Sequence, residues 1–131
     1  MFIINPETGA IIDANPSASR FYGYDHPTLL TMNINEINRM GDEAVKSAMT
    51  DALSQSRNYF EFTHTLADGS TRQVEVVSSP LADGDTTLLF TTIHDVTERN
   101  AALAENQRLL ADKEMLLAEV HHRIKNNMTL V

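Results

Sequence analysis

The fold is decided by residues 58–96, which read NYFEFTHTLADGSTRQVEVVSSPLADGDTTLLFTTIHDV. Three runs in which apolar and polar residues alternate are separated by two Ala-Asp-Gly turns. Alternation with a period of two indicates strands that are buried on one face, and Asp-Gly pairs favour tight hairpin turns. In the first run, one face holds Phe60, Phe62, His64 and Leu66. The stretch therefore predicts three consecutive antiparallel strands.

A hairpin and a first helix are predicted before these strands. Residues 2–5 and 10–15 are apolar runs that flank a Pro-Glu-Thr-Gly turn, which is the pattern of two short strands. Asn15 is placed to cap a helix that begins at Pro16 and ends at Gly23. The chain is thus expected to enter the fold as strand, turn, strand and helix.

Further helical segments fill the middle of the sequence. Short helical turns are predicted near Asp25 and within residues 33–38, and a longer helix begins at Asp42. Its apolar residues recur at the spacing of one helical face: Val45, Ala48, Met49, Ala52 and Leu53. One face of the sheet must be covered, and these helices are the elements available. The predicted fold class is α+β, a five-stranded antiparallel sheet with short helices on one face, followed by a long C-terminal coiled-coil helix.

The composition limits the functions that the chain can carry. With 131 residues, 42% hydrophobic and 21% charged, one core with an appendage is expected. The formal charge of −8 disfavours nucleic acid or an anionic membrane as a partner. Cysteine is absent, which excludes disulfides, thiolate nucleophiles and cysteine zinc sites. No apolar run approaches the length of about 20 residues that spans a bilayer, and no signal peptide is recognised, so a cytoplasmic fragment without membrane contact is expected.

The C-terminal quarter is predicted to form one long helix. From Glu98 onward there is no Gly or Pro, and Thr97 is placed to cap the helix. The domain boundary is therefore drawn between residues 1–97 and residues 98–131. Apolar residues recur at every seventh position: Leu103, Leu110, Leu117, Ile124 and Val131. Such a heptad repeat is typical of a coiled coil, so a parallel homodimer through this helix is expected.

The second position of the predicted seam is imperfect. Three residues after the first four apolar positions stand Asn106, Lys113, Val120 and Asn127. The apolar residues that compete for this position are Leu109, Met115, Leu116 and Met128. Polar residues on a seam can specify its register or leave the helix poised to shift. The register stays open, and so does the choice between a dimerisation stalk and a signalling stalk.

Three motifs resemble those of a PAS domain. The family's second strand and first helix are similar to GAIIDANPSASRFYGY at 9–24, its Asp-Gly hairpin to LADGSTRQVEV at 66–76, and its closing Asp-(Ile or Val)-Thr-x-Arg motif to HDVTERN at 94–100. The resemblance covers residues 2–99 and implies a sensor domain with the order of elements predicted above.

The same resemblance implies a joint that passes a signal to the outgoing helix. In PAS domains the residues at Asp95 and Arg99 form an ion pair between the last strand and the helix, and Thr97 lies between them. An exposed pair of this kind contributes only about 0–1 kcal/mol, so its value would lie in geometry. The alternative is a simple strand end with an ordinary helix cap at Thr97.

The PAS resemblance also implies a pocket whose ligand the sequence leaves unknown. The absence of cysteine excludes a flavin–thiol adduct and a thioester-linked chromophore, and the absence of tryptophan disfavours flavin. No histidine within residues 42–56 could serve as an axial haem ligand. His64 and His94 are both expected to be half-buried on strands with one hydrogen bond each, although either could face a ligand. A small-molecule ligand therefore stays open.

Residues 116–131, LLAEVHHRIKNNMTLV, resemble the phospho-acceptor helix of sensor histidine kinases. In that family the box reads Glu-(Leu or Val)-x-His-Arg-(Val or Ile)-Lys-Asn. The matching residues here are Glu119, His122, Arg123, Lys125 and Asn126, with His122 at the phosphorylated position. The resemblance implies a parent histidine kinase with ATP and Mg²⁺ in its catalytic domain and a response regulator receiver domain as its partner.

The chemistry of these side chains agrees with that role. A neutral imidazole carries a nucleophilic lone pair at neutral pH, so His122 could accept a phosphoryl group. Arg123 and Lys125 could stabilise the developing charge, and Glu119, three residues earlier on the same face, could orient the ring or accept its proton. His121 points about 100° away around the helix and is taken as a flanking residue.

Other interpretations of the box stay open. Adjacent histidines on a charged helix are often solvated surface residues. The spacing of Glu119 and His122 also matches di-iron helix bundles, but the further carboxylates of such sites are missing, so no metal site is predicted. No Gly-rich nucleotide-binding stretch is present, so the 131 residues are expected to be inactive as a kinase alone. The alternative function is a non-catalytic dimerisation or scaffold module with a vestigial box.

Overall fold

The structure is a computed structural model that describes residues 1–129, with the side chains of residues 1–126. Two compact units are distinguished, Met1–Thr97 and Glu98–Val131. The elements in chain order are β1 (Phe2–Ile4), β2 (Ile11–Ala14), α1 (Pro16–Tyr22), α2 (His26–Leu29), the 3-10 helix η1 (Ile34–Glu36), α3 (Asp42–Leu53), β3 (Tyr59–Thr65), β4 (Thr71–Asp83), β5 (Thr86–Asp95) and α4 (Thr97–Thr129).

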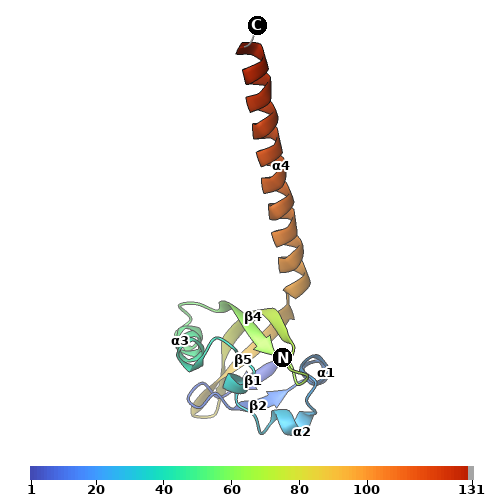
Figure 1. The fold of residues 1–131 in the computed structure, drawn as a ribbon. Coiled ribbons are helices and arrows are strands. Elements are labelled where there is room, and N and C mark those ends of the chain that lie inside the picture. Colours follow the sequence, from blue (N-terminus) through green and yellow to red (C-terminus); the bar gives the residue numbers. More distant parts are fainter. Residues whose placement is uncertain (130–131) are drawn as a thin grey trace. The chain divides into compact units, whose positions relative to one another are not determined.

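The first unit is built on one five-stranded sheet with the strand order β2-β1-β5-β4-β3 (Figure 1). Every neighbouring pair is antiparallel, and β4 and β5 form a long hairpin in which Val74 faces Asp95 and Asp83 faces Thr86. The sheet confirms the predicted fold class. The predicted coiled-coil pairing of the long helix stays a prediction.

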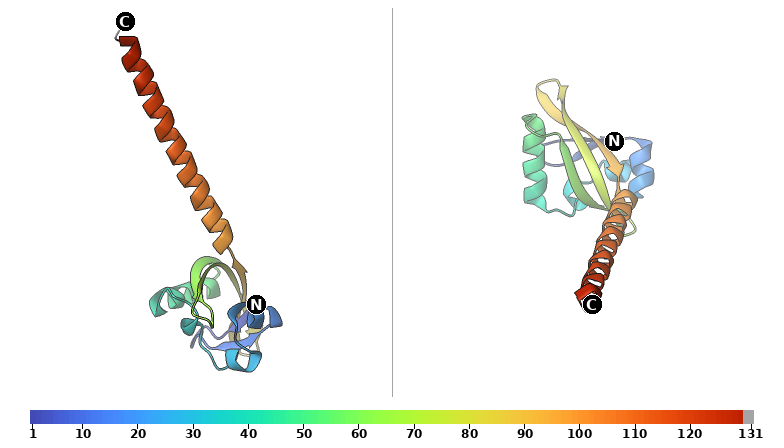
Figure 2. Two further views of the ribbon diagram at one scale, coloured as in Figure 1. Left: turned by 45° about the vertical axis from the view of Figure 1, so that its right-hand side comes forward. Right: turned by 90° about the horizontal axis from the view of Figure 1, so that it is seen from above.

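The helices and one face of the sheet form a single apolar core. α3 packs against β4 and β5, whereas α2 packs against β2 and α1. Figure 2 shows α1 and α3 on opposite sides of the sheet's centre. The strands contribute Phe2, Ile4, Phe60, Val74, Val76 and Leu89, and the helical region contributes Ala18, Tyr22, Leu29, Ile34, Ile37, Val45 and Ala52. Because these side chains come from both layers, the domain depends on the helices to cover the sheet.

The first helix begins and ends where the sequence predicts. The Asn15 side chain accepts a hydrogen bond of 3.0 Å from the Ala18 N–H, and Pro16 stands at the first helical position. Gly23 ends the helix with φ of 82°, and its N–H donates to the carbonyl of Ser19 at 2.9 Å. A side chain at Gly23 would be strained by this left-handed backbone and would meet Ala67 at 3.2 Å. These caps hold Tyr22, the last residue of α1, in the core.

The second unit consists of helix α4, and its side chains from residue 101 to residue 126 are all exposed. Within the described part of the chain, no helix is both long enough and apolar enough to cross a membrane.

Candidate functional site

A cavity of about 40 Å³ lies in the core of the domain, between α3 and the sheet. Ten of its fourteen lining residues are apolar, and the other four are Asn38, His64, Ser78 and Thr91. A water molecule needs about 10–15 Å³ of such space, so the cavity has room for roughly three water-sized groups. It is too small for haem or flavin as it stands.

Three of the polar lining residues have partners within the domain. The hydroxyls of Ser78 and Thr91 lie 2.9 Å apart across β4 and β5. The side-chain oxygen of Asn38 accepts a hydrogen bond of 2.9 Å from the backbone N–H of Met40. These bonds fix the polar wall of the cavity.

His64 is the exception, because only one of its ring nitrogens has a partner. Its Nδ1 lies 2.7 Å from the hydroxyl of Tyr22, whereas its buried Nε2 has no partner among the described residues. The side chain is 1% exposed, and burial lowers the pKa of His64 to about 4. Burial, and secondarily the negative charge of Asp95, raises the pKa of Tyr22 well above its ordinary value. Both groups are therefore neutral at pH 7.

The sequence prediction for the two strand histidines was wrong in its degree of burial. Both His64 and His94 were expected to be half-buried. The structure buries His64 completely, because residues on its face of β3 lie under the covering helices, and it exposes His94 on the other face of the sheet. The sequence analysis did not identify Tyr22 as the hydrogen-bond partner of His64.

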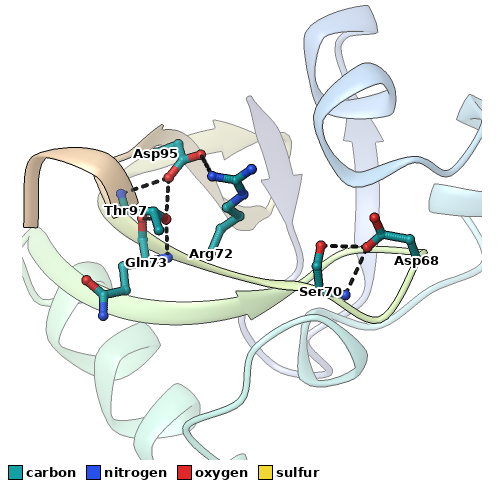
Figure 3. A network of polar contacts seen from close by, with 6 residues as sticks. All are labelled: Asp68, Ser70, Arg72, Gln73, Asp95 and Thr97. Carbon is teal, nitrogen blue, oxygen red and sulfur yellow. Dashed lines mark hydrogen bonds and ion pairs between the residues drawn. The ribbon is translucent and has the colours of Figure 1, made fainter. Parts of the chain in front are cut away.

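The joint at the end of β5 is a network of short polar contacts around Asp95 (Figure 3). One oxygen of Asp95 accepts hydrogen bonds from the backbone N–H and the hydroxyl of Thr97, at 2.9 and 2.7 Å. Its other oxygen lies 3.6 Å from the guanidinium of Arg72. Burial opposes ionisation of Asp95, but the Thr97 hydrogen bonds and the Arg72 charge outweigh it, so the pKa of this carboxyl lies below its usual value.

Thr97 connects this network to the start of β4. Its hydroxyl oxygen accepts a hydrogen bond of 2.8 Å from the Gln73 N–H. The sequence predicted Thr97 as the cap before the helix, but α4 begins at Thr97 itself. The Thr97 hydroxyl accepts its hydrogen bond from Gln73 of β4. The structure thus brings Asp95 and Thr97 together, and the ion pair of Asp95 with Arg99 stays a prediction.

Arg72 and Gln73 are joint residues that the sequence analysis missed. The signal that could have found them is the register of the β4–β5 hairpin, which pairs Val74 with Asp95. The turn before them is also ordered, because the Asp68 carboxylate accepts from the backbone N–H and hydroxyl of Ser70 at 2.9 and 2.6 Å (Figure 3).

The cavity and the joint are neighbours in the fold. A second hollow of about 150 Å³ is lined by Tyr22, Ile93 and Asp95 among others, and Ile93 also lines the first cavity. The Tyr22 hydroxyl is the partner of His64 in the first cavity. His64 and Tyr22 are thus hydrogen-bonded to each other, and Tyr22 and Asp95 line the same hollow.

The predicted phospho-acceptor lies on the exposed surface of α4. His122 Nδ1 is 3.3 Å from the side-chain nitrogen of Asn126, one helical turn later. Glu119, proposed to orient His122, contacts Arg123 instead, with 2.8 Å between carboxylate and guanidinium. The role of Glu119 toward His122 stays a prediction. Lys125 is exposed beside this group.

The apolar heptad residues lie on the opposite face of α4. Their exposed fractions are 52% for Leu103, 58% for Leu110, 49% for Leu117 and 50% for Ile124. At 100° per residue, His122 is turned about 140° from Leu117 and about 160° from Ile124. Val131, which the sequence also placed on the seam, lies outside the described residues, as do the side chains of Asn127 and Met128.

Comparison with known sequences identifies the first unit. A family model described as PAS domain matches residues 1–98. The diguanylate cyclase DgcM of Escherichia coli (strain K12) is 37% identical over 102 residues, which are 76% of this chain and 25% of that protein. The chain thus spans about a quarter of this curated relative. The family match ends before the histidine box.

Solved structures have the same fold. The PAS domain of an HTR-like protein from Haloarcula marismortui is 25% identical with a TM-score of 0.64, covering 72% of this chain and 78% of that one. A domain of a sensory box sensor histidine kinase/response regulator from Geobacter sulfurreducens is 21% identical with a TM-score of 0.57, covering 67% and 75%. At this identity the second likeness concerns the fold alone.

Proposed function

The chain belongs to the PAS domain family, and we propose that it is the sensory module of a two-component sensor histidine kinase. In this proposal the domain dimerises through α4 and controls phosphorylation of His122, and a response regulator receiver domain then takes the phosphoryl group. The observation that carries the proposal is the histidine box, with an exposed His122 flanked by Arg123 and Asn126 on the helix face opposite the apolar seam.

The proposed chemistry assigns a role to each residue of the box. ATP and Mg²⁺, bound by another domain of the intact protein, supply the phosphoryl group. A ring nitrogen of His122 forms a bond to the γ-phosphorus while the bond to the ADP oxygen breaks, and the ring proton passes to a base, for which Glu119 is our candidate. Asn126 donates to Nδ1 in the structure, which places the ring proton on Nε2, so attack by Nε2 requires the tautomer with the proton on Nδ1 and the release of the Asn126 contact.

The cationic residues of the box would act on the transferred group. Arg123 is held by Glu119 in the described state, so it must exchange this partner before it can contact a phosphoryl oxygen. An exposed pair of this kind is worth only about 0–1 kcal/mol, so the exchange costs little. Lys125 would supply a second positive charge beside His122.

The proposed dimer is formed by the seam of α4 from two copies of the chain. A helix whose leucines are about half exposed requires a partner to bury them, and the heptad spacing matches another copy of the same helix. Substituting Leu110→Ala and Leu117→Ala together should raise the dimer dissociation constant at least about a hundredfold, because each removes buried apolar surface. Arg108→Ala, turned about 160° from Leu110 around the helix and with a side chain that is 60% exposed, is the control. Sedimentation showing no weakening by the double substitution would refute this seam.

A second candidate function follows from the identity to the Escherichia coli diguanylate cyclase. At 37% identity over 102 residues, the domain could instead serve as the sensory module of a cyclase. A non-catalytic scaffold with a vestigial box is the remaining alternative.

Phosphorylation of the intact parent protein separates these functions. With radiolabelled ATP, we expect acid-labile label on the protein, its loss in His122→Gln, and its retention in His121→Gln, the matched neighbour. Label that survives His122→Gln would refute the assigned acceptor. A parent protein that takes up no label would favour the cyclase or the scaffold.

A further inference from the structure

The buried pair of His64 and Tyr22 fixes the position of one proton. The Tyr22 O–H has His64 Nδ1 as its partner at 2.7 Å. If Nδ1 carried the proton, the tyrosine proton and the Nε2 lone pair would both be buried without partners. If Tyr22 donates to Nδ1, only Nε2–H lacks a partner, which is the less costly arrangement. His64 therefore presents an N–H donor at Nε2.

This donor belongs to a residue that lines the core cavity. His64 is 1% exposed and Nε2 is fully buried without a partner. Most of the lining is apolar, including Val45, Met49 and Phe62. None of the lining residues carries a charge at neutral pH, because burial keeps His64 neutral. A carboxylate would thus meet no positive charge, and a water molecule would meet mainly apolar walls.

We propose that this cavity binds a small, neutral carbonyl compound, with its oxygen on His64 Nε2–H and its alkyl groups against the apolar wall below α3. The volume of about 40 Å³ holds about three water-sized groups, so a ligand of four non-hydrogen atoms requires the half-buried Ala48 and Met49 of α3 to shift outward. The proposal names the ligand class of the sensory module and so rests on the sensory part of the proposed function. The bound carbonyl would act on the joint through Tyr22, which is in contact with His64 and lines the hollow at Asp95.

Three molecules of nearly the same shape test this assignment on the whole chain. Acetone has the carbonyl, 2-methylpropene replaces its oxygen with CH₂, and acetate adds a negative charge. In protein with ¹⁵N-labelled histidine, acetone should shift the Nε2–H resonance of His64 in a saturable way at pH 7. Acetate should give no saturable shift at this resonance. An Nε2–H resonance that exchanges with water and ignores acetone would show a water-filled cavity and overturn the proposal, as would acetate binding as tightly as acetone.

A pair of substitutions separates the hydrogen bond from simple filling of space. His64→Phe with Tyr22→Phe removes both polar partners together, so that neither is left buried and alone. In this double variant acetone should bind about tenfold more weakly, the loss expected for one hydrogen bond, while 2-methylpropene should bind within about threefold of its original affinity. His94→Phe, which changes an exposed histidine on β5, should leave both affinities unchanged. Equal losses for the two probes would overturn the role of Nε2–H.

These binding results are independent of the proposed kinase activity. Failure of acetone to bind would leave the phosphorylation of His122 untouched. Conversely, a parent protein without histidine phosphorylation would leave the binding assignment intact. Where both hold, saturating acetone should change the initial rate of His122 labelling in the intact protein, and the double variant should not respond.

Discussion

The two units of this chain differ in what their apolar residues do. In Met1–Thr97 the apolar side chains of the sheet and the helices bury one another, so this unit has a hydrophobic core of its own. In α4 the regularly spaced leucines are exposed. A heptad spacing stabilises a helix only when a second helix packs against these leucines. The comparison teaches that the apolar residues of the domain stabilise its own fold, whereas those of the helix are left available for contact with another helix.

The largest effect on the free energy of unfolding is expected from a substitution in the core of the domain. Phe60 is 2% exposed and stacks on Phe62 with 5.8 Å between ring centroids. Phe60→Ala should lower the free energy of unfolding by about 3–5 kcal/mol, because it removes packing and leaves a cavity. Urea unfolding followed by tyrosine fluorescence measures the change. Leu110→Ala, 58% exposed on α4, should change domain unfolding by less than about 0.5 kcal/mol. Equal costs for both would contradict the contrast between the units.

A second prediction concerns acidification and the buried histidine. Burial lowers the pKa of His64 from 6.5 to about 4, so between these pH values the unfolded chain binds a proton that the folded domain does not. The unfolding free energy should therefore rise with pH through this window, and on the order of 3 kcal/mol should be lost from pH 6.5 down to pH 4. Denaturant unfolding at several pH values measures the slope.

Matched variants assign this slope to one residue. The double variant His64→Phe with Tyr22→Phe should lose this pH-dependent contribution, whereas His94→Gln should keep it because His94 is exposed. A double variant that retains the full slope would show that another group is responsible.

Much of the domain could be predicted because its signals are local. Alternation, Asp-Gly turns, the Asn15 cap and the Gly23 stop each involve neighbouring residues, and together they define the strands and helices. The PAS motifs agreed with the predicted order of elements along the chain, and the structure confirms that order. The pairing of β1 with β5 joins strands far apart in the sequence and was not predicted.

The candidate sites were harder to predict because their contacts join distant residues. Tyr22 and His64 are 42 positions apart. The alternation of residues could therefore predict which face of the strand carries His64, but not how deeply the side chain is buried or which residue is its partner. The contacts of Asp95 with Arg72 and of Thr97 with Gln73 depend on the register of the strands. A shift of the register by one residue would break both contacts. On α4 the heptad spacing predicts a seam, but its register stays open because the described side chains from residue 101 to residue 126 are all exposed.

A smaller effect is expected at the joint, where the domain meets its own outgoing helix in sequence. Thr97→Val keeps the shape of the side chain but removes the hydroxyl that accepts from Gln73 and donates to Asp95. The unfolding free energy should fall by about 1 kcal/mol, and the Gln73 amide should exchange faster with deuterium. Thr97→Ser retains the hydroxyl and is the control. If Thr97→Ser costs as much as Thr97→Val, the methyl group and not the hydroxyl holds the joint.

The smallest effect on stability is expected from the ion pair at the same joint. Arg72 and Asp95 are 3.6 Å apart, and their side chains are 37% and 30% exposed, so water screens their attraction. Arg72→Ala should lower the unfolding free energy by less than about 1 kcal/mol, and thermal unfolding in high salt should reduce the difference further. Arg72→Lys, which keeps the charge, is the control. Because Thr97 still holds Asp95 in both variants, a loss above about 2 kcal/mol would mean that Arg72, and not the hydrogen bonds of Thr97, fixes the end of β5.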